Sequence, residues 1–343
     1  EDFFVGGGFQ TGKLYIQDED GHFTGSPISK LNDGCVDSGS LFFDADGDGD
    51  LDLYVVSGGN QLSFENVKYQ DRLYINDGKG NFLLNTKALP IMLSSGSCIS
   101  AADFDNDGDL DLFLGGGVKP GYYPQCSKSY LLRNEGGRFV DVTDILAKGL
   151  QNIGIVTSAL WTDFDNDNKV DLIVAGEWMP ITVFKNNGKS FKNHTEKAGL
   201  ANSNGWWQSL ESGDFDHDGD MDFVAGNWGL NTPFRCSTEE PMSLYFADFD
   251  KNGKLDPIFS CYEDGKSYPV PSLDYMVEQM PILKKKFLHY SEYSSATTDE
   301  LIEMFDVKNF PKLYCKTLAS TYLKNNGDGT FDLEELPQAA QVA

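Results

Sequence analysis

An acidic nine-residue pattern occurs five times in this chain and constrains its fold more than any other feature. The copies read DADGDGDLD, DFDNDGDLD, DFDNDNKVD, DFDHDGDMD and DFDKNGKLD, and they begin at residues 44, 103, 163, 214 and 248. Aspartate, or in one case asparagine, occupies positions 1, 3, 5 and 9, and position 6 is usually glycine. Alternating oxygen ligands around a tight turn are typical of a loop that binds Ca²⁺, which accepts about six to eight oxygens in flexible geometry.

Each copy therefore predicts one structural Ca²⁺ ion, or about five ions in all. The predicted side-chain ligands are Asp44, Asp46, Asp48, Asp52; Asp103, Asp105, Asp107, Asp111; Asp163, Asp165, Asp167, Asp171; Asp214, Asp216, Asp218, Asp222; and Asp248, Asp250, Asn252, Asp256. The residues at position 7 are predicted to contribute only their backbone carbonyls: Asp50, Asp109, Lys169, Asp220 and Lys254. Asn168 replaces the usual glycine at position 6, because asparagine tolerates the left-handed conformation. Since Asn252 replaces a carboxylate, we expect the fifth loop to bind most weakly.

The EF-hand begins with a similar acidic pattern but does not explain these loops. An EF-hand requires glutamate at position 12 and a helix on each side. Position 12 is apolar in every copy here: Val55, Leu114, Val174, Ala225 and Phe259. The loops are followed by short apolar runs that end in glycine, such as LDLYVVSGG and LDLFLGGG, and runs of this kind predict strands.

A second element recurs between the loops and completes a repeating unit. The segments LYIQDEDGHF, LYINDGKGNF, LLRNEGGRF, VFKNNGKSF and YLKNNGDGTF each join an apolar strand to a phenylalanine-led strand through Asn, Asp and Gly. Such turns favour β-hairpins. With the strands that flank each loop, every unit has four antiparallel strands, which is the composition of a propeller blade.

These paired loops and hairpins resemble the FG-GAP/VCBS repeats of integrin-α-like β-propellers. GEWMPITVFKNNGKSF and GWWQSLESGDFDHDGDMDFVAGNWGLN also resemble bacterial extracellular VCBS-repeat proteins that often carry an ASPIC/UnbV module, although no such module is visible in the sequence. The resemblance implies an all-β, calcium-binding cell-surface propeller. Integrin-like relatives have seven blades, so seven are favoured here, and six remain an alternative.

We expect residues 1–343 to form a single propeller domain, interrupted by a helical insertion over residues 263–312, where the repeat pattern stops. Ser272 is predicted to begin a helix that Pro281 kinks or splits. Thr297 and Glu300 form a capping box that predicts a second helix.

Composition limits the partners and the location. The net charge is −26, from 53 acidic and 27 basic residues, which argues against nucleic-acid binding. No apolar run is long enough to span a membrane, and both a lipid anchor and a longer surface protein remain open. Weak Ca²⁺ loops suit compartments rich in the ion, so we expect an extracellular, periplasmic or outer-surface location. The six cysteines allow fifteen disulfide pairings or simply buried thiols.

The expected function is non-catalytic binding of a glycan or a protein at the cell surface. Aromatic side chains after the predicted inner strands are the candidate contacts, because such rings stack on sugars and fill protein interfaces; they are Trp178, Trp206, Trp207 and Trp228. Burial of these rings in the core is the alternative. No catalytic motif is present, and the remaining alternative is a polysaccharide hydrolase or lyase that uses Glu177 and Glu211.

Overall fold

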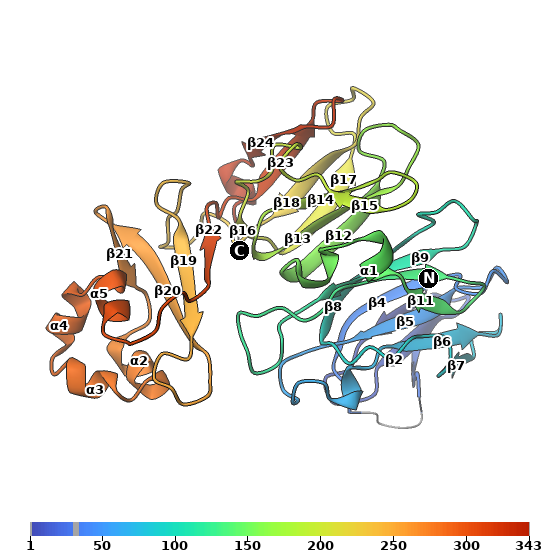
Figure 1. The fold of residues 1–343 in the computed structure, drawn as a ribbon. Coiled ribbons are helices and arrows are strands. Elements are labelled where there is room, and N and C mark those ends of the chain that lie inside the picture. The colour runs from blue at the N-terminus through green and yellow to red at the C-terminus, as the bar shows by residue number, and fades with distance from the viewer. Residues whose placement is uncertain (1, 30–33, 343) are drawn as a thin grey trace.

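The protein is mostly β-structure. The computed structural model describes residues 2–29 and 34–342. Within these residues the strands form six antiparallel sheets of three to five strands, which we number 1 to 6 (Figure 1). The all-β prediction is thus confirmed at the level of secondary structure. No helix in the described ranges is long and apolar enough to cross a membrane.

Sheets 1 to 3 contain strands that are neighbours in chain order. Sheet 1 consists of β1 (Phe3–Val5), β2 (Lys13–Gln17) and β3 (Phe23–Pro27). Sheet 2 consists of β4 (Asp37–Phe43), β5 (Asp52–Ser57), β6 (Arg72–Asn76) and β7 (Phe82–Leu84). Sheet 3 consists of β8 (Gly96–Ala102), β9 (Asp111–Gly116), β10 (Tyr130–Asn134) and β11 (Phe139–Asp141).

Sheets 4 to 6 are more elaborate. Sheet 4 contains β12 (Ile155–Thr162), β13 (Asp171–Met179), β14 (Thr182–Asn186) and β15 (Phe191–Asn193), and β16 (Gly205–Trp206) also pairs with β13. Sheet 5 contains β17 (Ser209–Gly213), β18 (Asp222–Gly226), β23 (Thr321–Asn325) and β24 (Phe331–Glu335). Sheet 6 has the order β21 (Lys266–Pro269), β20 (Asp256–Glu263), β19 (Met242–Ala247) and β22 (Lys312–Cys315).

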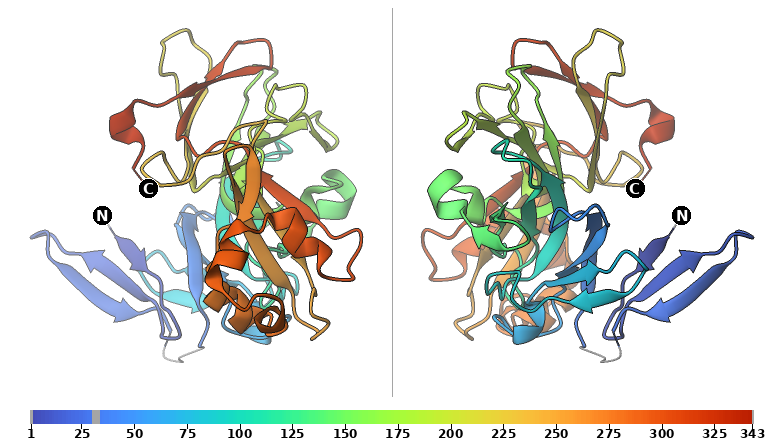
Figure 2. Two further views of the ribbon diagram at one scale, coloured as in Figure 1. Left: turned by 90° about the vertical axis from the view of Figure 1, so that its left-hand side faces the viewer. Right: turned by 90° about the vertical axis from the view of Figure 1, so that its right-hand side faces the viewer.

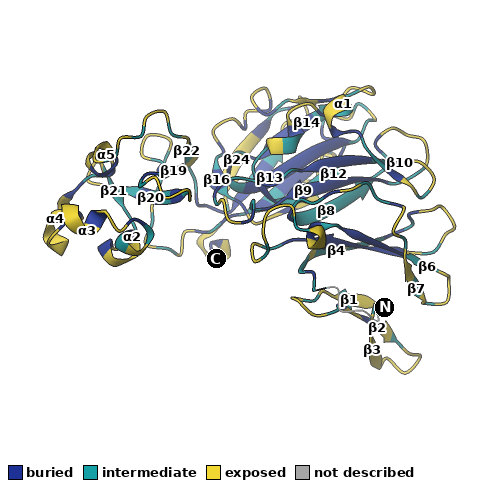
Figure 3. Ribbon diagram, turned by 60° about the horizontal axis from the view of Figure 1, so that its bottom comes forward, coloured by how far each residue is buried: buried dark blue, intermediate teal, exposed yellow. Residues whose placement is uncertain are grey.

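Sheets 2 to 5 pack on one another in chain order through their first strands, β4, β8, β12 and β17. Both faces of the second strands β5, β9 and β13 are covered. On β9, Leu112 and Leu114 pack toward sheet 2 while Phe113 packs toward sheet 4, because successive side chains point to opposite faces. Burial on both faces explains the uniformly apolar runs after the acidic loops, and Figure 3 shows β9 and β13 buried.

A propeller requires neighbouring sheets to pack through their first strands, and sheets 2 to 5 pack in this way. A closed ring of seven blades remains a prediction. Sheet 1 lies at one edge, where β3 is exposed along its length. Sheets 1 and 5 stand apart on the side of the molecule where both described chain ends lie (Figure 2).

Sheet 6 is inserted between two strands of sheet 5. The chain leaves sheet 5 after β18, builds sheet 6, and returns to pair β23 with β18. The hairpin of the fourth repeat is consequently separated from its acidic loop by the whole of sheet 6. The sequence did not reveal this arrangement, because the inserted sheet contains an acidic loop of its own.

Four helices lie within the segment where helices were expected: α2 (Leu273–Gln279), α3 (Leu283–Lys286), α4 (Tyr290–Ser295) and α5 (Thr298–Glu303). Ser272 is the N-cap residue of α2, and the chain breaks around Pro281 before α3, as predicted. Thr297 and Glu300 form both halves of the predicted capping box. Helix α4 was not predicted. The other short helices are α1 (Thr143–Leu146), η1 (Val67–Tyr69), η2 (Leu150–Asn152) and η3 (Gln338–Ala340).

Candidate functional site

Each acidic loop connects the first two strands of one sheet, from sheet 2 to sheet 6. In every loop, three aspartates each place a carboxylate oxygen within 4.8 Å of the others. In the described part of the chain these groups are Asp44, Asp46, Asp48; Asp103, Asp105, Asp107; Asp163, Asp165, Asp171; Asp214, Asp216, Asp218; and Asp248, Asp250, Asp256. Five groups of oxygens that could bind a metal ion therefore occur where the sequence predicted them.

The loop backbone is held in an unusual conformation. Position 6 has a positive φ in all five copies, with Asn168 at 60° and the glycines between 87° and 99°. Position 4 is also left-handed in every copy, including His217 at 62° and Lys251 at 64°. The sequence did not predict the left-handed conformation at position 4, because neither histidine nor lysine favours a positive φ. The two left-handed residues curl the chain so that alternate side chains converge.

The aspartate at position 9 anchors the loop to its sheet. This residue is at most 1 % exposed in all five copies. In the second loop, one oxygen of Asp111 accepts a hydrogen bond of 3.2 Å from the backbone of Phe104, and the other accepts one of 2.8 Å from the backbone of Asn134. Asp52 and Asp222 make the same two kinds of contact. Position 9 therefore closes the loop and joins it to the third strand.

Burial strongly perturbs these carboxyl groups. It raises the pKa of Asp111 and of Asp171 to about 7 and that of Asp256 to about 6. Repulsion from the neighbouring aspartates raises the pKa further, whereas backbone hydrogen bonds oppose the rise. Without a bound cation, ionisation of these groups is costly.

The loops suit a hard divalent cation. Among the described residues, three buried aspartate oxygens in these loops have no hydrogen-bond partner: Oδ1 of Asp165, Oδ2 of Asp171 and Oδ1 of Asp214. Buried polar atoms normally have partners, so such orphans point to a missing ion or water. All donors are oxygens, which suits Ca²⁺ or Mg²⁺ rather than a softer metal.

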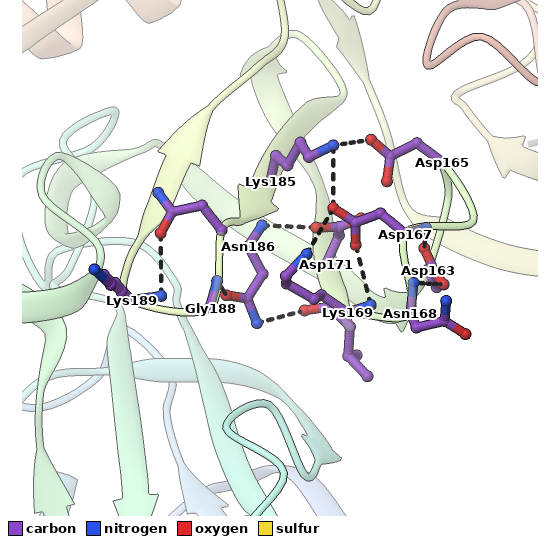
Figure 4. A network of polar contacts seen from close by, with 12 residues as sticks. Asp163, Asp165, Asp167, Asn168, Lys169, Asp171, Lys185, Asn186, Gly188 and Lys189 are labelled. Atoms are coloured by element: carbon purple, nitrogen blue, oxygen red, sulfur yellow. Dashed lines mark hydrogen bonds and ion pairs between the residues drawn. The ribbon is translucent and has the colours of Figure 1, made fainter.

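The third loop differs from the others because two lysines reach its carboxylates (Figure 4). The Lys185 ammonium contacts Asp165 and lies 3.4 Å from Asp167, and the Lys169 ammonium lies 3.1 Å from Asp167. These ammonium groups lower the pKa of Asp167, although burial acts in the opposite direction. Lysine and a metal ion would compete for the same oxygens in this loop.

In sheets 3, 4 and 5, an asparagine at the end of the third strand links the sheet to the acidic loop of the preceding sheet. Asn134, Asn186 and Asn325 donate side-chain hydrogen bonds to Ala45, Phe104 and Phe164, at 2.9, 2.8 and 2.8 Å respectively. Each acceptor is the carbonyl at position 2 of the preceding loop. The sequence signal was present, since an asparagine begins the turn of each of these hairpins, but it was interpreted only as a turn residue.

The four candidate tryptophans do not form one exposed platform. Trp206 and Trp228 are half-buried, and their ring centroids are 4.3 Å apart. Trp178 is buried, its ring centroid lies 4.9 Å from that of Trp206, and its indole donates a 3.0 Å hydrogen bond to the Tyr123 hydroxyl. Trp207 is fully buried in the core between sheets 4 and 5, and its indole donates to the Ser203 carbonyl. The expectation that Trp207 contacts a ligand is therefore corrected, because Trp207 directly follows β16 and its ring faces the core, opposite to the ring of Trp206.

Trp206 and Trp228 line a cavity of about 700 Å³ together with both candidate glutamates, Glu177 and Glu211. The cavity lies on the face of sheet 5 that is turned away from Trp207. Its other lining residues are Gln208, Ser209, Val224, Gly226, Asn227, Ser320, Leu336, Ala340 and Val342. Burial raises the pKa of Glu177, and a hydrogen bond from Trp206 partly offsets this rise.

A bulge in β13 presents Glu177 to the cavity. Glu177 pairs with Trp206, and Met179 pairs with Gly205, so Trp178 is an extra residue on its strand. Trp178 has a φ of 60°, which is rare for a bulky side chain. Bulges and strained residues of this kind are over-represented beside functional sites.

Comparison with known proteins identifies the repeat class. A model of the FG-GAP-like repeat matches residues 44–114 and 163–225, which contain the first four acidic loops. The chain thus contains FG-GAP-like repeats, and the resemblance inferred from the sequence is confirmed. No curated protein matches significantly.

Three solved structures are similar in fold only weakly. An Agrocybe aegerita lectin, described as recognising non-reducing terminal N-acetylglucosamine, has 14 % identity and a TM-score of 0.40, with 98 % of this chain and 90 % of that chain covered. The V. cholerae biofilm matrix protein Bap1 has 11 % identity and a TM-score of 0.33, with 97 % and 65 % covered. BBS1N, solved in complex with ARL6DN, has 11 % identity and a TM-score of 0.32, with 89 % and 93 % covered.

Proposed function

We propose that this protein is a calcium-stabilised propeller that binds carbohydrate in the cavity beside Trp206 and Trp228, outside the cytoplasm. About five Ca²⁺ ions would be held by the acidic loops, with side chains at positions 1, 3, 5 and 9 and the carbonyl at position 7 as ligands. The ion supplies positive charge that offsets the clustered carboxylates. The recurrence of one such loop in each of sheets 2 to 6 suits a structural role.

The observation that carries this proposal is the composition of the cavity. Two half-buried tryptophans provide apolar faces for a sugar ring, while Glu177, Glu211, Gln208 and Asn227 provide polar groups for its hydroxyls. The volume of about 700 Å³ is in the usual range for small-ligand sites. A protein ligand, which the sequence left open, would more often use a broad surface of roughly 800 Å².

The negative charge of the cavity and of the whole chain limits which sugars we expect to bind. Among the described residues that line the cavity none is basic, and two are glutamates. The net charge of −26 adds a repulsive background for anions. We therefore expect neutral or amino sugars to bind and uronic-acid or sulfated sugars to be rejected.

A hydrolase or lyase is the second candidate, because Glu177 and Glu211 line one cavity beside aromatic rings. The raised pKa of Glu177 suits a general acid, and the exposed carboxyl of Glu211 is the candidate partner. Paired carboxylates in contrasting environments are the arrangement that glycoside cleavage requires.

The test is binding of defined oligosaccharides in millimolar Ca²⁺, using neutral, amino-sugar and uronic-acid oligomers as probes. We expect Trp228→Ala to weaken binding at least roughly fivefold, since a stacked ring contributes about 1–3 kcal/mol. The matched control is Tyr275→Ala, which removes an aromatic ring that is 71 % exposed on α2, away from the cavity. Undiminished binding by the Trp228 variant would refute the site.

The same oligomers distinguish binding from cleavage. Release of reducing ends by the wild type, lost in both Glu177→Gln and Glu211→Gln, would establish the enzyme. Binding without product release would establish the lectin-like function. Binding to none of the oligosaccharide classes would refute both candidates.

A further inference from the structure

Two cysteines that are far apart in the sequence, Cys236 and Cys315, lie together in the apolar cluster that contains the tryptophans. Cys315 lies on β22, directly opposite Met242 of β19. Cys236 lies in the loop before β19, and its thiol contacts the backbone of Met242. The two side chains also interact directly with each other and belong to one apolar cluster. The pairing of Cys315 with Met242, and the contact of Cys236 with the same Met242, thus bring the two cysteine side chains together.

We propose that Cys236 and Cys315 form a disulfide bond in an oxidising compartment. The sequence allowed fifteen complete connectivities of six cysteines, and this bond reduces them to three. Both residues are thiols in the structure and belong to a single apolar cluster that also contains Trp178, Trp206 and Trp228. Cysteine side chains that already interact need little backbone movement to reach bonding geometry.

The two thiols have complementary environments. Cys315 is fully buried, and its thiol donates a 3.2 Å hydrogen bond to the Thr317 carbonyl. The neighbouring Cys315 side chain lowers the pKa of Cys236, although burial acts in the opposite direction. Cys236 is only half-buried, so an oxidant can reach it. Cys236 is therefore the attacking thiol, and Cys315 is the resolving one.

The oxidant belongs to the class of disulfides, either a small molecule such as oxidised glutathione or a protein dithiol oxidase. The Cys236 thiolate attacks the oxidant disulfide, and one of the oxidant's sulfurs leaves as a thiol. Cys315 then attacks the mixed disulfide, and the second oxidant sulfur leaves as a thiol. Two cysteine thiols are oxidised, one external disulfide is reduced, and two protons pass to the departing sulfurs.

The bond would fasten the loop that carries Trp228 and Phe234 to β22. These two rings pack 5.8 Å apart, and Trp228 packs on Trp206. Strand β22 also contacts β13 and β16 of sheet 4. A covalent link at this point would hold sheet 6, sheet 4 and the aromatic cluster in one arrangement.

Peptide mapping tests the pairing directly. The full chain is equilibrated with oxidised glutathione in millimolar Ca²⁺, alkylated, and digested with trypsin without reduction. We expect a linked pair of peptides, residues 236–251 and 313–316, that separates on reduction. A link from Cys236 to the peptide of Cys261, residues 255–266, would overturn the assignment, as would full alkylation of both Cys236 and Cys315.

A thermal melt provides the second readout, with and without a phosphine reductant. The oxidised wild type should melt roughly 5 °C above its reduced form, because the bond closes a long loop. Cys236→Ser should melt identically in both conditions, while the control Cys261→Ser, a half-buried thiol of the same cluster, should retain the difference. If Cys236→Ser retained the difference as well, the proposed bond would be refuted.

Discussion

The side-chain amide of Asn186 donates a 2.8 Å hydrogen bond to the backbone carbonyl of Phe104, and so joins sheet 4 to the acidic loop of sheet 3. The same amide donates to Val170, and its oxygen accepts from Gly188. Asn134 and Asn325 repeat this link in sheets 3 and 5. These acidic loops therefore connect neighbouring sheets through hydrogen bonds, in addition to being candidate metal sites.

Asn186→Ala should destabilise the protein by about 2–4 kcal/mol, because it leaves two carbonyls and an amide without their partner. Chemical denaturation in constant millimolar Ca²⁺ measures the change. Asn187→Ala is the control, since Asn187 is exposed in the same turn and bonds only within that turn. Equal losses for the two variants would show that Asn186 has no special linking role.

The pH dependence of stability should reverse when Ca²⁺ is removed. Burial raises the pKa of Asp111 and Asp171 to about 7, well above the unfolded value of 3.8. The folded state therefore holds protons that the unfolded state has lost, and stability falls as the pH rises from about 4 through 7. In EDTA the protein should melt at a higher temperature at pH 5.5 than at pH 7.5.

In millimolar Ca²⁺ the order should be the opposite, because the ion binds deprotonated carboxylates and binds only the folded loops. Melting curves at the two pH values, with and without Ca²⁺, give the four measurements required. If the melting temperature in EDTA rose with pH, burial would not be the dominant influence on these aspartates.

Lys185→Gln should strengthen metal binding at the third loop by about threefold to tenfold. The variant removes an ammonium group that contacts Asp165 and lies 3.4 Å from Asp167, and a partly exposed charge contact of this kind is worth roughly 1 kcal/mol. Calcium titration calorimetry detects the change. Lys192→Gln removes an exposed lysine of the next strand and should leave the affinities unchanged.

The structure also alters which loop is expected to bind most weakly. From the sequence, the fifth loop is the weakest because Asn252 replaces a carboxylate. In the structure, the third loop holds two ammonium groups among its carboxylates. If Lys185→Gln left every calcium affinity unchanged, Lys185 would not compete with the ion. The fifth loop, with Asn252, would then remain the one expected to bind most weakly.

The two neighbouring tryptophans should respond differently to truncation. Trp207→Ala should cost about 3–5 kcal/mol of stability, because the ring is fully buried and makes a buried hydrogen bond. Trp206→Ala should cost less stability and should weaken oligosaccharide binding, because Trp206 is half-buried and lines the cavity. Similar effects of the two variants on both stability and binding would contradict the opposite orientations seen in the structure.

The local features of this fold were readable from the sequence, because each is encoded within about ten residues. The acidic loops, the hairpin turns and the capping box at Thr297 all occur where the pattern predicted them. Glu177 and Glu211 were paired as an enzymatic alternative, and they do line one cavity.

Features that depend on distant contacts were not readable. The return of β23 to β18 across sheet 6 is set by packing that no local pattern encodes. The burial of Trp207 beside a cavity-lining Trp206 depends on which face of a short strand meets the core. The contact between Cys236 and Cys315 likewise follows from the position of β22, which the repeat pattern did not reveal.

The central claim is that the five loops are calcium sites that stabilise the scaffold. Native mass spectrometry of protein dialysed against micromolar and then millimolar Ca²⁺ tests it most directly, with Asp214→Ala as the single-loop variant. The account predicts up to five bound Ca²⁺ ions in the wild type and one fewer in the variant. A wild-type chain that binds no Ca²⁺ at millimolar concentration would contradict it.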